Sequence, residues 1–186
     1  MLKRLLIVGM LFIPAAAWAF VKPIRIFAPE LTGISCINDT LCIDDASRFQ
    51  EALALYEEAL NFTDTTVGLI ERNPRVTFCT TENCLQSFGL GRRAGITMGT
   101  FGIVISPRAW KPYYVRHEMI HHLQNEKLGM VKALLEPKWF MEGMAYSLSE
   151  DPRPKLSEPF EQYRVQFKGW YKQVDKEKLW AEASNL

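Results

Sequence analysis

The sequence predicts an α+β fold in a single domain. Short segments with strand-like patterns gather in the first 105 residues, and longer segments with helical periodicity dominate from residue 112 onward. The length of 186 residues corresponds to one domain. We therefore expect residues 20–186 to form one domain, in which a small mixed sheet is followed by C-terminal helices.

Residues 1–19 are expected to be a signal peptide and are set apart from the fold. Lys3 and Arg4 form a basic start, residues 5–16 are apolar, and Ala17-Trp18-Ala19 has the small-x-small pattern that signal peptidase reads. The alternative is an uncleaved N-terminal anchor, since the apolar run of about 17 residues is at the lower limit for crossing a bilayer. Either outcome predicts an exported protein, periplasmic or secreted, with membrane attachment only if this segment is retained.

Four cysteines fit an exported protein. Three pairings are open to them, and closeness in sequence favours Cys36–Cys42 and Cys79–Cys84. The alternative is a zinc site made of all four thiolates. Paired zinc ligands are usually two residues apart, whereas the gaps here are five and four residues. We therefore expect two local disulfides.

The strands are expected before residue 106. They cover 24–28, 75–79, 96–98 and 103–105, and the last two form a hairpin with Gly99 and Gly102 at its turn. Residues 29–43 and the segment after 79 are expected to be loops that carry the two cysteine pairs. These strands are short, which fits a small sheet.

The helices are expected mainly in the second half. They run from Asp44 or Asp45 to about Asn61, from Pro112 to about Leu128, from Pro137 to about Ser147, and over the aromatic-rich segment 160–174. Gly129 is a suitable C-cap for the second of them. A short last segment carries Leu179, Trp180 and Ala183.

The charge balance and the histidines narrow the function. The chain has 22 basic and 21 acidic residues, so it lacks the basic excess that nucleic-acid binding needs. All three histidines fall within six residues, in the segment His-Glu-Met-Ile-His-His at 117–122. The function is therefore expected to lie in this segment.

The spacing of this segment predicts a metal site on a helix. Residues i and i+4 lie on one face of a helix, so His117 and His121 can both bind one zinc ion. Glu118 lies about 100° around the helix, beside the metal, where it can take a proton from water. His122 lies about 140° from His117 and is expected near the site or at the surface. Met119, Ile120 and Leu123 form the opposite, packing face.

A catalytic zinc needs a third protein ligand. No histidine remains outside the cluster, so the third ligand is expected to be a carboxylate. Glu142 is the strongest candidate, in the segment Pro-Lys-Trp-Phe-Met-Glu-Gly-Met-Ala at 137–145. About twenty residues separate it from His121, which is enough to end one helix, turn and enter the next.

These two segments together resemble the gluzincin metallopeptidases, in their bacterial peptidase-MA-like form. The resemblance covers about residues 95–150 and implies a zincin-like domain in which the edge hairpin packs on the HExxH helix. It implies His117, His121 and Glu142 as zinc ligands and Glu118 as general base and acid. It also implies that an extended peptide substrate adds to the hairpin.

One position departs from this family. Thermolysin-like relatives place an aspartate four residues after the ligand glutamate to orient a zinc histidine, and Tyr146 stands there. Asp151 or Ser147 are alternatives for this orienting role. Related enzymes also use a His or Tyr donor to the developing oxyanion, and the candidates for it are Tyr113, Tyr114, Tyr163 and Arg164.

The sequence thus predicts an exported zinc-dependent peptidase, a hydrolase that acts on a peptide or protein as a monomer. A different interpretation is an exported zinc-bearing binding or assembly protein that does not cut. The presence of Glu118 disfavours it. Hydrolysis of a non-peptide amide, such as a cell-wall crosslink, is a third interpretation that the sequence does not separate from proteolysis.

Overall fold

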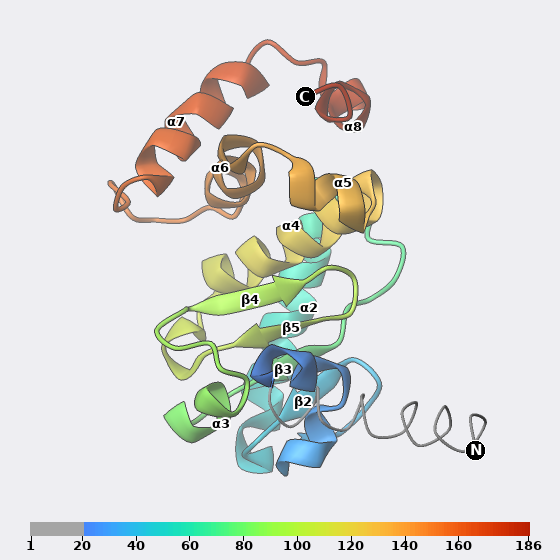
Figure 1. The fold of residues 1–186 in the computed structure, drawn as a ribbon, viewed down its shortest axis with the longest axis vertical. Coiled ribbons are helices and arrows are strands. Elements are labelled where there is room, and N and C mark those ends of the chain that lie inside the picture. The colour runs from blue at the N-terminus through green and yellow to red at the C-terminus, as the bar shows by residue number, and fades with distance from the viewer. Residues whose placement is uncertain (1–20) are drawn as a thin grey trace, which may run out of the picture.

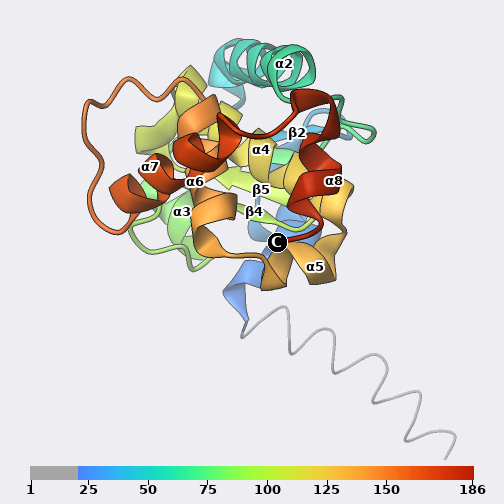
Figure 2. The same ribbon diagram turned by 90° about the horizontal axis from the view of Figure 1, so that it is seen from above.

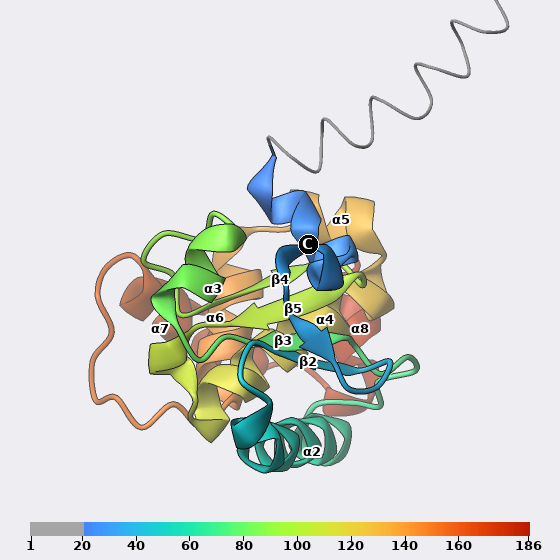
Figure 3. The same ribbon diagram turned by 90° about the horizontal axis from the view of Figure 1, so that it is seen from below.

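The computed structural model describes residues 21–186 and has a mixed α+β fold around a five-stranded sheet. The strands are β1 (Ser35–Cys36), β2 (Leu41–Ile43), β3 (Val76–Phe78), β4 (Gly95–Met98) and β5 (Gly102–Ile105). Their order is β1-β2-β3-β5-β4, as Figure 3 shows for the last four. The central strands β2, β3 and β5 are parallel, and β1 and β4 pair antiparallel at the two edges.

Helices cover the sheet and extend beyond it. The α-helices are α2 (Phe49–Thr66), α3 (Glu82–Ser87), α4 (Pro112–Leu128), α5 (Met130–Leu135), α6 (Lys138–Leu148), α7 (Phe160–Tyr171) and α8 (Leu179–Ala183). The 3-10 turns are η1 (Lys22–Phe27), η2 (Pro29–Thr32), η3 (Ala46–Arg48), η4 (Pro107–Ala109) and η5 (Lys176–Lys178). Figure 1 shows α6, α7 and α8 at the end of the molecule away from β2 and β3.

The alternation of side chains along each strand divides the core into two faces. One face carries six large apolar side chains: Leu41, Ile43, Val76, Phe78, Ile103 and Ile105. Helices α2 and α4 pack against this face with Tyr56, Met119 and Leu123 among their buried residues. Figure 2 shows these two helices on the same side of the sheet. Helix α4 is thus fixed along one side by the sheet.

The opposite face of the sheet is covered by η1 and α3. Cys42 and Val104 point to this side and pack with Ile26, Leu85 and Phe88. Both expected disulfides, Cys36–Cys42 and Cys79–Cys84, are present, so the predicted pairing is confirmed.

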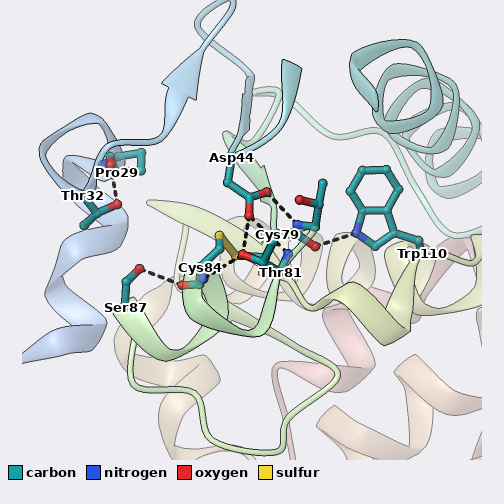
Figure 4. Close-up of a disulfide and its surroundings, with 9 residues drawn as sticks. Pro29, Thr32, Asp44, Cys79, Thr81, Cys84, Ser87 and Trp110 are labelled. Carbon is teal, nitrogen blue, oxygen red and sulfur yellow. Dashed lines mark hydrogen bonds between the residues drawn. A yellow bond between two sulfur atoms is a disulfide. The ribbon is translucent and has the colours of Figure 1, made fainter. Parts of the chain in front are cut away.

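The Cys79–Cys84 disulfide sits in a hydrogen-bonded loop at the end of β3 (Figure 4). Asp44 accepts hydrogen bonds from the backbone N–H of Thr80 at 2.6 Å and from the Thr81 hydroxyl at 2.8 Å. The indole of Trp110 donates to the carbonyl of Cys79 at 2.9 Å. These bonds join the loop to the segments before α2 and α4.

A third cluster holds α6 against α4. Ile120 on α4 packs with Phe140, Met144 and Phe167, all fully buried. Gly143 lies directly against the backbone carbonyl of Tyr163 on α7, so a side chain there would collide with it. This close approach fixes how α6, which carries Glu142, lies on α4.

Most of the expected helices and strands are present, with ends that differ by a few residues from the predicted ones. The structure differs from the prediction in three places. The expected strand over 24–28 is wrong, because the 3-10 turn η1 covers Lys22–Phe27, with Pro23 in its first turn, and buries Ile26 over Gly102 of β5. The expected loop over 29–43 contains η2, β1 and β2, and the second cysteine loop contains α3. Helix α5 was not expected.

The expected signal segment, residues 1–19, lies outside the described residues. Across residues 21–186, no helix combines the length and the apolar character needed to cross a bilayer. The two disulfides are compatible with an exported protein.

Candidate metal centre

The HExxH segment lies in the middle of α4, as expected from its spacing. The Nε2 atoms of His117 and His121 are 3.1 Å apart, which places both rings on one side of the helix. Oε2 of Glu142, on α6, lies 3.7 Å from the first nitrogen and 3.8 Å from the second. The structure thus brings the three predicted ligand residues together, with their ligand atoms within 4.8 Å of one another.

The triangle formed by these atoms has the size that a zinc ion requires. A point equidistant from the two nitrogens and the Glu142 oxygen lies about 2.1 Å from each, and zinc binds histidine nitrogen and carboxylate oxygen at about 2.0–2.2 Å. A second group of potential ligands, Glu30 with Cys36 and Cys42, lies elsewhere. Its two sulfurs are bonded to each other, so they are not available as thiolates.

The electrostatics of the centre keep Glu142 in its charged form. Burial acts to raise the pKa of Glu142, but hydrogen bonding to His117 and His121 holds this pKa far below its usual range. Burial opposes a charge on His121, yet the hydrogen bond and charge of Glu142 raise the pKa of its ring to about 9. Glu142 therefore remains a carboxylate, and the charge that balances it comes from a proton or from a metal ion.

Gln124 orients His121. Its Oε1 lies 2.7 Å from Nδ1 of His121, and its Nε2 donates to the carbonyl of Met141 at 3.0 Å. The side chain is fully buried, so both bonds are shielded from water. Gln124 follows His121 by three residues on the same helix face, a signal that the sequence contained. Gln124 thus connects His121 with Met141, the residue that precedes the predicted ligand Glu142.

The two candidates for orienting a zinc histidine both have other partners. Asp151 pairs with Arg153 and also lies close enough to His117 for an electrostatic interaction, and Ser147 donates to the carbonyl of Arg164 at 3.4 Å. The ring of Tyr146 instead packs on His117, with 4.4 Å between ring centroids. Burial, followed by the charge of Glu142, raises the pKa of Tyr146 to about 12, so its hydroxyl stays protonated at neutral pH.

Glu118 is held beside the centre by the edge strand. The pleat of β4 turns Gly95 and Thr97 toward α4, and the Thr97 hydroxyl donates to Oε2 of Glu118 at 2.7 Å. A methyl group on Gly95 would lie 2.7 Å from Oε1 of Glu118, closer than atoms can pack. The side chain of Glu118 therefore occupies the space that a Cβ atom at position 95 would take.

His122 is buried and takes no part in the centre. It is 1% exposed, and its Nε2 lies 2.9 Å from the carbonyl of Arg72 and 3.3 Å from Oε1 of Glu126. Glu126 in turn accepts hydrogen bonds from the backbone N–H groups of Glu71 and Arg72. A surface position for His122 is therefore wrong: it ties α4 to the loop that precedes β3.

A cleft of about 780 Å³ runs along β4 and contains the centre. His117, Glu118, His121 and Glu142 line it, together with all four residues of β4. Strand β4 pairs with β5 on one side only, since it ends the sheet among the described residues. Its other edge therefore offers backbone groups for pairing.

Of the four residues proposed as oxyanion donors, one lines this cleft. It is Tyr114. Arg164 is 7% exposed and donates to the carbonyls of Arg153 and Pro154, which is a structural role. Tyr113 and Tyr163 do not line the cleft. Tyr146 does line it, and the sequence reasoning singled this residue out only as a departure from a family pattern.

The fold and the centre together define a class: a mixed α+β protein with a His–His–Glu group of metal-binding type in a cleft beside an edge strand. In comparisons with known proteins, no family model, no curated protein and no solved structure matches the chain.

Proposed function

We propose that the protein is an exported zinc-dependent metallopeptidase of the gluzincin type. The single observation that carries this proposal is the triangle of His117 Nε2, His121 Nε2 and Glu142 Oε2, which fits one zinc ion. The two disulfides support an exported setting. The resemblance of residues 95–150 to gluzincins supports the same function.

His117, His121 and Glu142 would hold the metal. A zinc ion bound there supplies a Lewis acid, which lowers the pKa of water and polarises a carbonyl. Gln124 fixes the ring of His121 so that Nε2 faces the centre, because the hydrogen bond occupies Nδ1. The ring of Tyr146 limits the movement of His117 from the other side.

Glu118 is the proposed general base and acid. Its carboxylate lies beside the centre, and Thr97 holds one oxygen in place. It would accept the proton of the attacking water and pass that proton to the leaving amine. The close approach that Gly95 permits keeps this carboxylate next to the strand on which a peptide would lie.

Tyr146 is the proposed donor to the oxyanion. Its phenol lines the cleft beside His117 and remains protonated, and no described residue forms a hydrogen bond with its hydroxyl. A preorganised donor of this kind stabilises negative charge that develops on the scissile carbonyl oxygen. An extended peptide that pairs with the free edge of β4 would lie in the cleft that Tyr146 and Glu118 both line.

The test compares the wild-type chain with Glu118→Gln on a broad peptide library, after the zinc content of each has been measured. We expect cleavage by the wild type and loss of at least about two orders of magnitude in Glu118→Gln, with zinc retained. Glu57→Gln is the matched control, since Glu57 is exposed on α2. Equal activity in the wild type and Glu118→Gln, or none in either, would reject the proposal and favour a zinc-bearing binding protein.

A further inference from the structure

Helix α5 exposes most of its apolar side chains. Of its six residues only Ala133 is buried. Val131 is 75% exposed, Leu134 76% and Leu135 78%. A helix this short gains little stability from its own hydrogen bonds and normally depends on burying an apolar face. These side chains contribute little to the core, which suggests that they serve a partner.

The exposed side chains of α5 belong to a larger apolar area. Phe101, in the β4–β5 turn, is 47% exposed, and the neighbouring Thr100 hydroxyl lies 3.8 Å from the sulfur of Met130. Figures 1 and 2 show α5 beside this turn. We call the five residues Phe101, Met130, Val131, Leu134 and Leu135 the α5 surface. Contiguous exposed apolar areas of this kind mark binding sites.

The α5 surface is continuous with the cleft. Phe101, Met130 and Leu134 line the cleft itself, and Met130 also lines a second hollow of about 690 Å³ with Val131 and Leu135. Strand β4 runs from the metal centre toward the turn that Met130 touches. An extended peptide rises about 3.3 Å per residue. A peptide paired with β4 would therefore contact α5 through residues that lie roughly three or more positions from its own scissile bond.

The charges on α5 indicate the chemistry of the partner. Lys132, the one charged residue of α5, pairs at 3.0 Å with Glu136, which directly follows the helix. A membrane-surface helix usually presents several free Lys or Arg side chains, and α5 has one lysine, which is paired. A stable second copy needs about 800 Å² from each partner, more than a six-residue helix offers alone.

We propose that the α5 surface binds an apolar segment of the polypeptide substrate, outside the residues that flank the scissile bond. This inference rests on the proposed function. It defines the substrate class as polypeptides that expose large aliphatic or aromatic residues in an extended stretch. Folded proteins that bury such residues would be poor substrates.

The test measures binding without turnover, in the zinc-loaded full chain carrying Glu118→Gln. The probe is a fluorescein-labelled peptide of about fifteen residues rich in Leu and Val, long enough to cover both β4 and α5. A matched peptide has Gln and Ser in place of Leu and Val. The test variant adds Val131→Lys with Leu135→Lys, and the control variant adds Leu69→Lys with Val165→Lys, which are 64% and 61% exposed and outside the cleft.

We expect fluorescence anisotropy to show affinity for the apolar peptide at least about tenfold weaker in the α5 variant and unchanged in the control variant. The polar peptide should bind weakly to the α5 variant and to the control variant, with the same affinity for each. Equal affinity of the apolar peptide for the α5 variant and its parent would overturn the inference. Two other outcomes would also overturn it. If the α5 variant differs from its parent only in sedimentation, the α5 surface binds a second copy of the chain. If it differs only in flotation with phosphatidylcholine–phosphatidylglycerol vesicles, the α5 surface binds a membrane.

The failure of this inference is distinguishable from failure of the proposed function. A chain that binds the apolar peptide through α5 but hydrolyses no peptide would refute the peptidase activity and retain the α5 site. If the chain hydrolyses short peptides, but Val131→Lys with Leu135→Lys leaves its affinity for the apolar peptide unchanged, the peptidase activity stands and the α5 site is refuted.

Discussion

Replacing Gln124 with leucine tests whether this residue orients the metal centre. The substitution keeps a buried side chain of similar size but removes the bond to His121 Nδ1 at 2.7 Å and the bond to the Met141 carbonyl at 3.0 Å. Loss of a group that orients a metal-binding histidine usually weakens metal affinity about 10–100-fold. At about 1.4 kcal/mol per tenfold change, this corresponds to roughly 1.4–2.8 kcal/mol of zinc binding.

The same substitution has a second expected effect, on the zinc-free protein. Gln124→Leu removes two hydrogen bonds made by a fully buried side chain, while the Met141 carbonyl, which lies within α6, keeps the bond of its own helix. At about 0.5–1.5 kcal/mol for each bond, the loss of both costs about 1–3 kcal/mol. The free energy of unfolding of the zinc-free chain should therefore fall by about that amount. The two effects are separable because the first is measured by metal binding and the second by denaturation.

The assay is zinc competition against a chromophoric chelator, followed by urea denaturation. Asn125→Ala is the matched control, since its Nδ2 donates to the backbone carbonyl of His121 at 2.7 Å and not to the ring. We expect zinc affinity to fall in Gln124→Leu and to stay near the wild-type value in Asn125→Ala. A folded Gln124→Leu chain with zinc affinity within about twofold of the wild type would refute the orienting role.

Three further predictions concern α6 and the loop that follows it. Tyr146→Phe should lower kcat on a cleaved peptide about 10–1000-fold while zinc content is kept, and unchanged kcat would remove Tyr146 as oxyanion donor. Gly143→Ala should destabilise the chain by about 1–3 kcal/mol, seen by denaturation, because the methyl group meets the Tyr163 carbonyl. Burial acts to raise the pKa of Asp151, but hydrogen bonds from Arg153 lower it. The stability this gives is present above the ordinary pKa of 3.8 and is lost as pH falls through the lowered value. The Tm difference between the wild type and Asp151→Asn should therefore be smaller near pH 2.5 than at pH 6, and an equal difference at both would contradict this account.

The parts of the centre that depend on one helix could be predicted from the sequence. His117, Glu118 and His121 take their relative positions from 3.6 residues per turn, and the structure has them on one regular helix. Glu142 could be predicted because the absence of further histidines favoured a carboxylate as third ligand, and because its distance from His121 in the sequence is enough to enter a second helix. The cysteine pairs could be predicted because, among three possible pairings, closeness in sequence favoured the two that are present.

The remaining features depend on how elements pack. Tyr146 lies on His117 because α6 approaches α4 at an angle fixed by Gly143 and the third core cluster, which no local pattern encodes. Residues 24–28 have a strand-like pattern, but Ile26 finds its buried place over Gly102 from a 3-10 turn. His122 has a polar side chain on a helix, and its partner, the carbonyl of Arg72, lies 50 positions away in the sequence.

The loading of the His117–His121–Glu142 centre with zinc is the most direct test of the central claim. Metal analysis of the chain purified without chelator should give about one zinc per chain for the wild type and for Glu57→Ala. Glu142→Ala should lose it, because two histidines alone leave the ion one protein ligand short. No zinc in the wild type, or the same zinc content in Glu142→Ala, would contradict the account.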